Sequence, residues 1–423
     1  MNDRRRNVLG VILLGVWCAV PSVAAISIPD TSRARAAVLA RMTAPVQRYE
    51  AVVRELVPQF GSDPVIFRTE EQNESRYYLF IAPEDDRFDV ASPGTVIIRR
   101  RIEDGAFEQI KIFLQHHEGS FVRLRPRGRT LRMDLFLAWA PLYRDVPVPI
   151  TMERALTVPF ATLRDATRGV VDWSLLDPDV YDPGYAAIRR MIGEARRALS
   201  DVPDASDGAP LSIETAAADE EAPELDHFGF AKWVVDGLYG ARTGSYLPAE
   251  SLKHKHLDHR GTAWSAARED DRDPYFGLDG TRNLAREMYG LERGVTARLL
   301  DPEIADVRTV PVARYREDVG YAMDQLRATL YWLAVTEPGT LYLGSVNRSF
   351  GDELVLRQHT RVVVFLPFFD EEGRFEVAIV ERAAETSLDA LERRYEGDFI
   401  HLVRVRADGR FDPPPFRPQS AGF

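Results

Sequence analysis

Three of the eight histidines lie within six residues, in the run 254–259, His-Lys-His-Leu-Asp-His. Imidazole nitrogens and carboxylate oxygens are common zinc ligands, and this short spacing lets several of them converge on one ion. A zinc-bound water is a nucleophile near neutral pH. His254, His256, Asp258 and His259 therefore form a candidate site for metal-dependent hydrolysis.

The histidine run is similar to the His-x-His-x-Asp-His motif of the metallo-β-lactamase fold, in which the motif follows an apolar strand. Here the preceding segment, 246–251, is polar and is interrupted by Pro248. A solvated surface loop without a function is therefore the alternative interpretation. In the metal-site interpretation, His359 and His401 are candidate further ligands, with Asp370 between them.

A second candidate site begins in the segment 226–235, Asp-His-Phe-Gly-Phe-Ala-Lys-Trp-Val-Val. This segment resembles the signature of NlpC/P60 cell-wall peptidases, papain-like enzymes that cut the stem peptides of peptidoglycan. In that family a helix opens with Asp-Cys-Ser-Gly-Phe-Val, and Asp226, Gly229 and Phe230 match this pattern. The resemblance implies a helix that starts at residue 227 and packs on an antiparallel sheet.

Two later segments follow in the family's order. The run Pro338-Gly339-Thr340-Leu341 resembles the family's Pro-Gly-Asp-Leu turn into a strand, and the next strand resembles the one that begins with the catalytic histidine, here His359. His401, on a later strand, corresponds to the third, orienting residue. The resemblance implies a cleft near His227, His359 and His401, and it requires a long insertion before Pro338.

The position of the family's nucleophile is held by His227 instead of cysteine. A thiol at a helix N-terminus is activated because the helix dipole lowers its pKa, whereas an imidazole there cannot serve as an acyl-forming thiolate. The only cysteine, Cys18, lies in the apolar N-terminal stretch. Aligning the family's Thr-His-Val with residues 360–362 would place Arg361 at the position of the catalytic histidine. Only the alternative alignment places a histidine, His359, at that position. With its nucleophile replaced, the resemblance implies a degenerate, non-catalytic domain, for which we expect no catalytic residue and no cofactor.

The first 25 residues have the layout of a secretory signal peptide: arginines 4–6, an apolar core over 8–20 and small residues at 22–25. We expect residues 1–25 to be removed on export. The mature protein would then be periplasmic or extracellular, without cysteine and without a transmembrane segment. A retained membrane anchor is the alternative.

Charge and composition restrict the class of partner. The 423 residues include 65 acidic and 54 basic residues, which gives a net charge of -11. Affinity for nucleic acid comes from concentrated Lys and Arg, so we expect no nucleic-acid partner. The apolar fraction of 45% is that of a globular protein, and the length fits two or three domains.

The elements that position these residues fall into two domains of an α+β protein. Residues 26–199 are expected to form a β-rich N-terminal domain, with an amphipathic helix over 31–56 followed by a β-meander. Eight carboxylates without any Lys or Arg predict a disordered acidic linker over 200–225. Residues 226–423 are expected to form the papain-like domain, with helices, an antiparallel sheet and the long insertion.

These observations favour an exported envelope protein whose C-terminal domain binds peptidoglycan or another envelope component. The alternative from another class is a metal-dependent hydrolase with zinc at the 254–259 run. A purely structural envelope protein, with neither a metal nor a ligand site, is the third interpretation.

Overall fold

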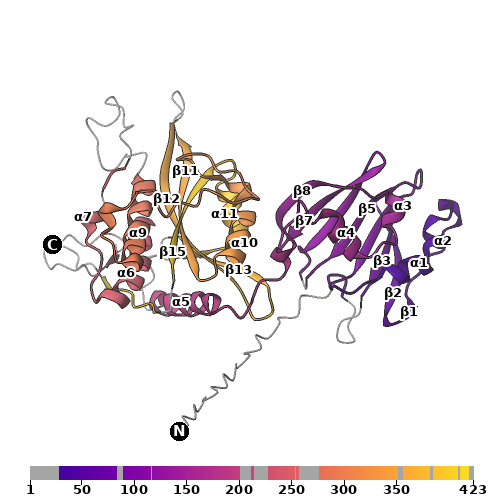
Figure 1. The fold of residues 1–423 in the computed structure, drawn as a ribbon, viewed down its shortest axis with the longest axis horizontal. Coiled ribbons are helices and arrows are strands. Elements are labelled where there is room, and N and C mark those ends of the chain that lie inside the picture. The colour runs from indigo at the N-terminus through magenta and orange to yellow at the C-terminus, as the bar shows by residue number, and fades with distance from the viewer. Residues whose placement is uncertain are drawn as a thin grey trace, which may run out of the picture.

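The computed structural model describes residues 28–82, 89–115, 117–200, 211–213, 227–252, 254–256, 276–350, 356–381, 384–407 and 410–418. The expected signal peptide and most of the acidic segment lie outside these ranges, as do Asp258 and His259. The chain is an α+β protein with two lobes, each of which contains a large antiparallel sheet (Figure 1). Helix α5 (Pro183–Ser200) follows the N-terminal lobe in sequence and lies along the C-terminal lobe.

The N-terminal lobe is built on an eight-stranded antiparallel sheet in which each strand pairs with its neighbours in sequence. This arrangement confirms the expected β-meander. Its strands are β1 (Glu55–Gln59), β2 (Ser62–Gln72), β3 (Ser75–Ile81), β4 (Val96–Arg101), β5 (Phe107–Phe113), β6 (Phe121–Arg127), β7 (Thr130–Leu137) and β8 (Ala140–Val148).

One face of this sheet forms the core of the lobe. Successive strand residues point to opposite sides, so Tyr78 and Phe80 of β3 meet Ile98 of β4 on the buried face. Apolar residues of α3 (Met152–Ala155), α4 (Phe160–Thr167) and the 3-10 helix η2 (Trp173–Leu176) join the same core. The alternation of apolar residues in the strands therefore explains which face is covered.

The single helix expected over residues 31–56 was wrong. The segment instead contains α1 (Ser32–Ala37), α2 (Leu39–Thr43) and the 3-10 helix η1 (Val46–Arg48), and β1 begins at Glu55. Pro45 directly precedes η1, and proline lacks the amide that continues an α-helix. Further on, the amide of Val52 donates to Thr69 Oγ1 at 2.8 Å, which ties this segment to β2. Apolar spacing alone does not detect such a break.

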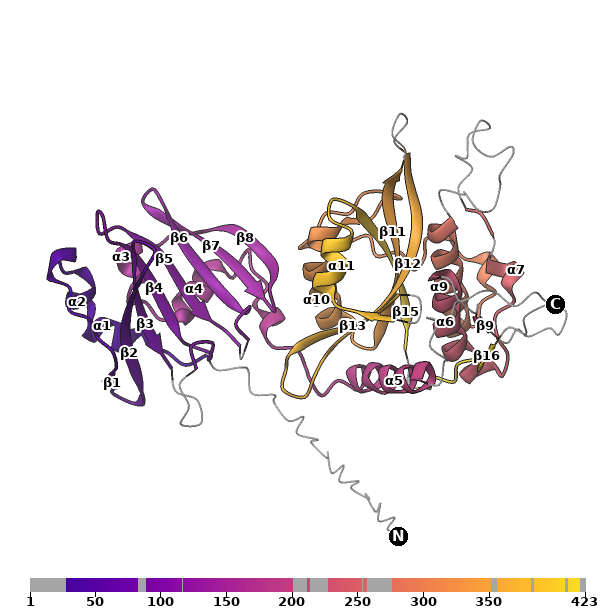
Figure 2. The same ribbon diagram turned by 180° about the vertical axis from the view of Figure 1, so that it is seen from behind.

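The C-terminal lobe contains a six-stranded antiparallel sheet in the order β10-β15-β11-β12-β13-β14. Helices α6 (His227–Thr243) and α9 (Phe276–Arg293) lie on one face, and α10 (Leu326–Thr336) and α11 (Leu388–Arg394) lie on the other (Figure 2). The strands are β10 (Tyr321–Ala322), β11 (Thr340–Phe350), β12 (Leu356–Phe369), β13 (Phe375–Glu381), β14 (Ala384–Thr386) and β15 (Phe399–Arg406). Shorter helices are α7 (Ala249–Leu252), η4 (Ala297–Leu299) and η5 (Met323–Gln325).

Both faces of this sheet are buried. Leu343 and Val364 pack with Trp233 of α6 on one side, whereas Phe365 packs with Leu330 of α10 on the other. A strand that is covered on both faces carries a continuous apolar run instead of an alternating one, as β12 does.

The two lobes share a core. Ala328, Tyr331 and Ala334 of α10 belong to the same apolar cluster as the N-terminal sheet. The Tyr331 hydroxyl donates to the main-chain oxygen of Leu175 at 2.9 Å, and the Tyr185 hydroxyl donates to that of Ala334 at 2.8 Å. These buried contacts fix α10 against the N-terminal lobe.

Residues inside the expected acidic linker form a strand, β9 (Leu211–Ile213), which pairs with β16 (Phe416–Pro418). The expected linker is therefore not unstructured over its whole length. Among the described residues, no helix has the length and apolar composition required to cross a membrane.

Candidate functional site

His359 lies on β12, and two polar side chains of the neighbouring strand β11 hold its ring. The Ser345 hydroxyl oxygen lies 2.8 Å from Nδ1, and Asn347 Nδ2 lies 2.9 Å from Nε2. The main-chain oxygen of Asp318 lies 3.0 Å from Nε2. Because a carbonyl oxygen only accepts, we assign the ring proton to Nε2, which donates it to Asp318, and Nδ1 accepts from the Ser345 hydroxyl. In this tautomer the approach of Asn347 Nδ2 to Nε2 is a contact between two donors and not a hydrogen bond.

These side chains are removed from solvent, with exposed fractions of 0% for Ser345, 2% for His359 and 3% for Asn347. Burial disfavours the charged imidazole, and the nearby His401 adds to this effect, so the pKa of His359 is lowered to about 3. His359 is therefore neutral at pH 7. Its burial corrects the expectation that it lines an open cleft.

His401 lies on β15 directly opposite Ser345 and is also fully buried. Its Nε2 lies 3.2 Å from Asp306 Oδ2, and Arg282 Nη2 of α9 donates to the same oxygen at 2.7 Å. Burial alone would raise the pKa of Asp306, but His401 and Arg282 outweigh it and lower this pKa to about 2. His401 was expected to orient His359, but the side chain that contacts His359 Nε2 is Asn347. His401 instead lies in a buried cluster with Asp306 and Arg282.

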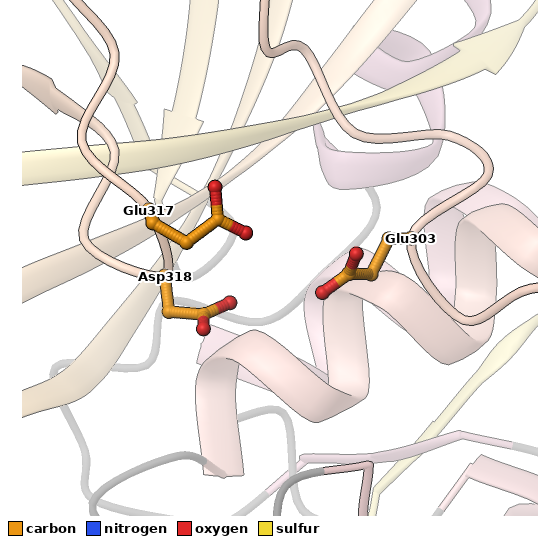
Figure 3. Close-up of side chains that lie close together, drawn as sticks. All are labelled: Glu303, Glu317 and Asp318. Atoms are coloured by element: carbon orange, nitrogen blue, oxygen red, sulfur yellow. The ribbon is translucent and has the colours of Figure 1, made fainter.

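Three carboxylates, Glu303, Glu317 and Asp318, lie next to this cluster with their oxygens within 4.8 Å of one another (Figure 3). Oxygen-rich groups of this kind can hold hard cations. Here each of the three already pairs with an arginine. Arg282 Nη2 lies 3.0 Å from Asp318 and 3.4 Å from Glu303, and Arg308 Nη2 lies 2.5 Å from Glu303 and 2.9 Å from Glu317. The geometry therefore supports an ion-pair network at this position and not a metal centre.

The start of α9 packs directly on the strand that carries His359. A Cβ atom on Gly277 would lie 2.7 Å from the main-chain oxygen of His359 and 3.1 Å from Ser345 Oγ, so only glycine permits this approach. The start of α6 lies beside it, because the rings of Phe228 and Phe276 meet edge-on with centroids 5.3 Å apart.

His227 is the first residue of α6, which confirms the helix start expected there. The neighbouring Phe228 contacts the first residue of α9, and the second residue of α9 contacts the main chain of His359. The start of α6 and His359 are thus linked through the start of α9, at one end of the lobe.

His254 and His256 lie side by side, with ring centroids 5.0 Å apart. His256 Nε2 lies 2.7 Å from Asn283 Oδ1, and Asn283 Nδ2 donates to the main-chain oxygens of Leu252 and His254. The amide oxygen must therefore accept from Nε2–H, which leaves His256 Nδ1 as a lone pair without a partner in the described part of the chain. Burial lowers the pKa of His256 to about 4, so this ring is neutral.

The other expected metal ligands are not brought to this pair within the described residues. His359 and His401 belong to the buried clusters on the sheet, and Asp370 accepts from Arg374 Nε at 2.6 Å in the turn after β12. In addition, Arg286 Nη2 donates to Asn283 Oδ1 at 3.1 Å. This positive charge lowers the pKa of His256 further and opposes a cation at the site.

Sequence reasoning missed Ser345, Asn347, Asp306 and Arg282. One signal for the first two lies in β11 itself. Every second residue of a strand points to the same face, so residues 341, 343, 345 and 347 share one face of β11. Ser345 and Asn347 therefore continue a face that begins with two buried leucines. No comparable local signal marks Arg282 and Asp306, which are 24 residues apart.

Comparison with known proteins adds one match. Residues 25–175, less than half of the chain, match a family described as a domain of unknown function (DUF8515). The matched residues include all eight strands of the N-terminal sheet. No curated protein and no solved structure matches the chain.

Proposed function

We propose that the protein is exported to the cell envelope and that its C-terminal lobe is an NlpC/P60-like domain that binds peptidoglycan, or another envelope component, without cutting it. The observation that carries this proposal is the packing of Gly277 against the main chain of His359. In the family that the sequence resembles, a thiol at a helix start faces a histidine on the sheet. Here the helix start that packs on His359 is that of α9, at Gly277, and the start of α6 at residue 227 lies beside it.

The order of elements supports the resemblance. Helix α6 precedes the turn at Pro338 and Gly339, the turn leads into β11, and the next strand carries His359. All of these elements belong to one lobe, in which helices pack on an antiparallel sheet. The long segment between α6 and β11 contains α9, which occupies the space beside the histidine.

Ser345 is the hydroxyl that contacts His359, but its surroundings do not support nucleophilic attack. A reacting carbonyl needs a free position about 3 Å from the attacking oxygen. The Ser345 side chain is fully buried, and the backbone of α9 approaches it so closely that a Cβ atom on Gly277 would lie 3.1 Å from Oγ. Strand β11 is also paired on both sides, with β12 and β15. The Ser345–His359 hydrogen bond therefore supports a structural role.

Co-sedimentation of the exported chain with purified peptidoglycan sacculi tests the proposed binding. We expect saturable recovery of the chain in the pellet and its release by soluble peptidoglycan fragments. Serum albumin, another acidic protein, should remain in the supernatant under the same conditions. If the chain also remains there at every sacculus concentration, envelope binding is wrong and a structural role is the better account.

One observation favours a second candidate function, metal-dependent hydrolysis. Asn283 holds Nε2–H of His256, and the Nδ1 lone pair has no partner among the described residues. Metal-binding histidines are commonly oriented in this way by a second partner. This candidate requires Asp258 and His259 as further ligands. Stoichiometric zinc in the untagged protein that disappears in His256→Ala would establish it, and the absence of zinc after titration would remove it.

A further inference from the structure

A pocket of about 1100 Å³ lies at the junction of the two lobes. The N-terminal lobe contributes residues of β8, α4 and η2 to its lining, and the C-terminal lobe contributes Pro311 and Trp332. Figure 2 shows β8 and α10, which carries Trp332, facing each other at this junction. Small-molecule sites are common where domains meet.

Aromatic side chains line the pocket and are held in place. Tyr143, Trp173 and Trp332 are all partly exposed. Trp173 Nε1 donates to Thr167 Oγ1 at 3.2 Å, and the Tyr143 hydroxyl oxygen accepts from the amide of Asp172 at 3.1 Å. These hydrogen bonds fix two of the three rings before any ligand arrives, which lowers the entropy cost of binding.

Polar groups in the pocket have free bonding capacity. Arg164 of α4 is exposed and makes no ion pair with any residue that the structure describes, whereas Arg168 pairs with Asp165 at 2.5 Å. The indole N–H of Trp332 likewise has no acceptor within the described ranges. Asp172 is exposed, so its carboxylate can accept further hydrogen bonds.

We propose that this pocket binds an oligosaccharide that carries carboxylate groups. Flat aromatic faces cover the apolar C–H faces of sugar rings, and the free donors and acceptors bind the hydroxyls. Arg164 then binds a ligand carboxylate through paired, charge-assisted hydrogen bonds. Peptidoglycan fragments combine sugar rings with peptide carboxylates. The inference rests on the proposed function, because it places the peptidoglycan site at the lobe junction instead of at the buried His359.

Titration calorimetry with two probes tests this assignment on the exported chain. One probe is the disaccharide tetrapeptide that a muramidase releases from peptidoglycan, and the other is chitotetraose, which has no carboxylate. Arg164→Gln should weaken binding of the disaccharide tetrapeptide about tenfold and leave that of chitotetraose unchanged, since only the first probe offers an ionic partner. The matched control is Arg129→Gln, at an exposed arginine outside the pocket, which should bind both probes like the wild type.

The aromatic contribution is tested separately. Trp332→Leu should weaken both probes, because the ring covers sugar faces whether or not carboxylates are present. Trp332→Phe keeps most of the packing of α10 and should lose affinity to a smaller extent. Equal affinity of the wild type, Arg164→Gln and Trp332→Leu for the disaccharide tetrapeptide would overturn the assignment.

Sacculus co-sedimentation of the same variants separates this inference from the proposed function. Binding of the wild type that is lost in the double variant Arg164→Gln/Trp332→Leu supports both. Equal binding of the wild type and the double variant overturns the pocket and leaves envelope binding intact. Binding of the disaccharide tetrapeptide without binding of sacculi supports the pocket and overturns envelope binding. Failure to bind either material overturns both.

Discussion

Gly277, at the start of α9, packs against the main-chain oxygen of His359 on β12, where a Cβ atom would approach to 2.7 Å. This contact joins the start of α9 to the strand that carries His359. The protein thus has a histidine that is buried, neutral and covered by helix backbone. We conclude that the histidine stabilises the lobe, and the predictions below follow from this conclusion.

The first prediction concerns the Gly277 contact. Gly277→Ala forces a methyl group against backbone, and overpacking of this kind destabilises a protein by about 1–3 kcal/mol. Gly193→Ala in α5 is the matched control, since nothing lies within 4 Å of a Cβ atom there. Alanine in a helix interior should instead stabilise by about 0.5–1 kcal/mol. Chemical denaturation measures both, and equal effects of the two substitutions would show that the contact is looser than described.

The second prediction concerns the buried ion pairs. Arg282 has a fully buried side chain, and Arg282→Met would leave the buried Asp306 without one of its partners. Breaking a buried pair from one side destabilises by about 3–5 kcal/mol. The control is Arg127→Met, which removes a pair with Asp145 in which both side chains are more than half exposed. That change should cost less than about 1 kcal/mol. Urea denaturation measures the free energy of unfolding of both variants. Equal losses in the two would contradict the expectation that the buried pair contributes more than the exposed one.

The third prediction is a loss of stability in acid. The pKa of His359 is about 3 in the folded protein against an ordinary 6.5, so between these values the unfolded chain binds a proton that the folded protein does not. The free energy of unfolding should therefore fall as the pH decreases from 6.5 towards 3, by at most about 1.4 kcal/mol per pH unit for this group. Asp306 acts in the same direction at lower pH, because its pKa is lowered from 3.8 to about 2.

Substitutions assign this acid dependence to a residue. His359→Gln retains hydrogen-bonding groups but cannot titrate. The slope of the free energy of unfolding against pH, between pH 6.5 and 4, should therefore become shallower. Thr130→Val, at an exposed residue that does not titrate, should leave the slope as in the wild type. Thermal denaturation over this pH range measures both, and an unchanged slope in His359→Gln would mean that other groups cause the acid sensitivity.

The fourth prediction concerns metal. Arg286 lies close to His256, and the carboxylates near Arg282 already pair with arginines, so we expect the purified protein to contain less than stoichiometric zinc. Elemental analysis of the untagged chain checks this, with and without prior incubation in zinc. One zinc per chain in the wild type, absent from His256→Ala, would favour the hydrolase instead.

Much of the fold follows from local patterns. Alternating apolar residues such as Tyr78, Phe80 and Ile98 predict the N-terminal strands and the face that they bury. The helix expected over 31–56 fails because the apolar spacing continues past Pro45, and the segment is tied to β2 by contacts that local spacing does not encode. The start of α6 at residue 227 was predictable, since the segment that begins there resembles a motif in which a helix opens.

The site was predictable only in part. His359 could be identified from the resemblance, but its partners depend on the register of β11 against β12, which shifts between Val346 and Asn347. That irregularity lies between Ser345 and Asn347, both of which contact the one imidazole ring. The role of α9 was not predictable, because the segment carries no family signature and its contact with β12 joins residues more than 80 positions apart.

The central claim, binding without cutting, is tested most directly by incubating the exported chain with purified sacculi and analysing both fractions. The pellet is assayed for bound protein, and the supernatant is assayed for released stem peptides by chromatography and mass spectrometry. We predict that the protein is recovered with the sacculi and that released peptides do not exceed those of the buffer control. Release of stem peptides that is abolished in His359→Ala would contradict the account, because it would show that the buried histidine is catalytic.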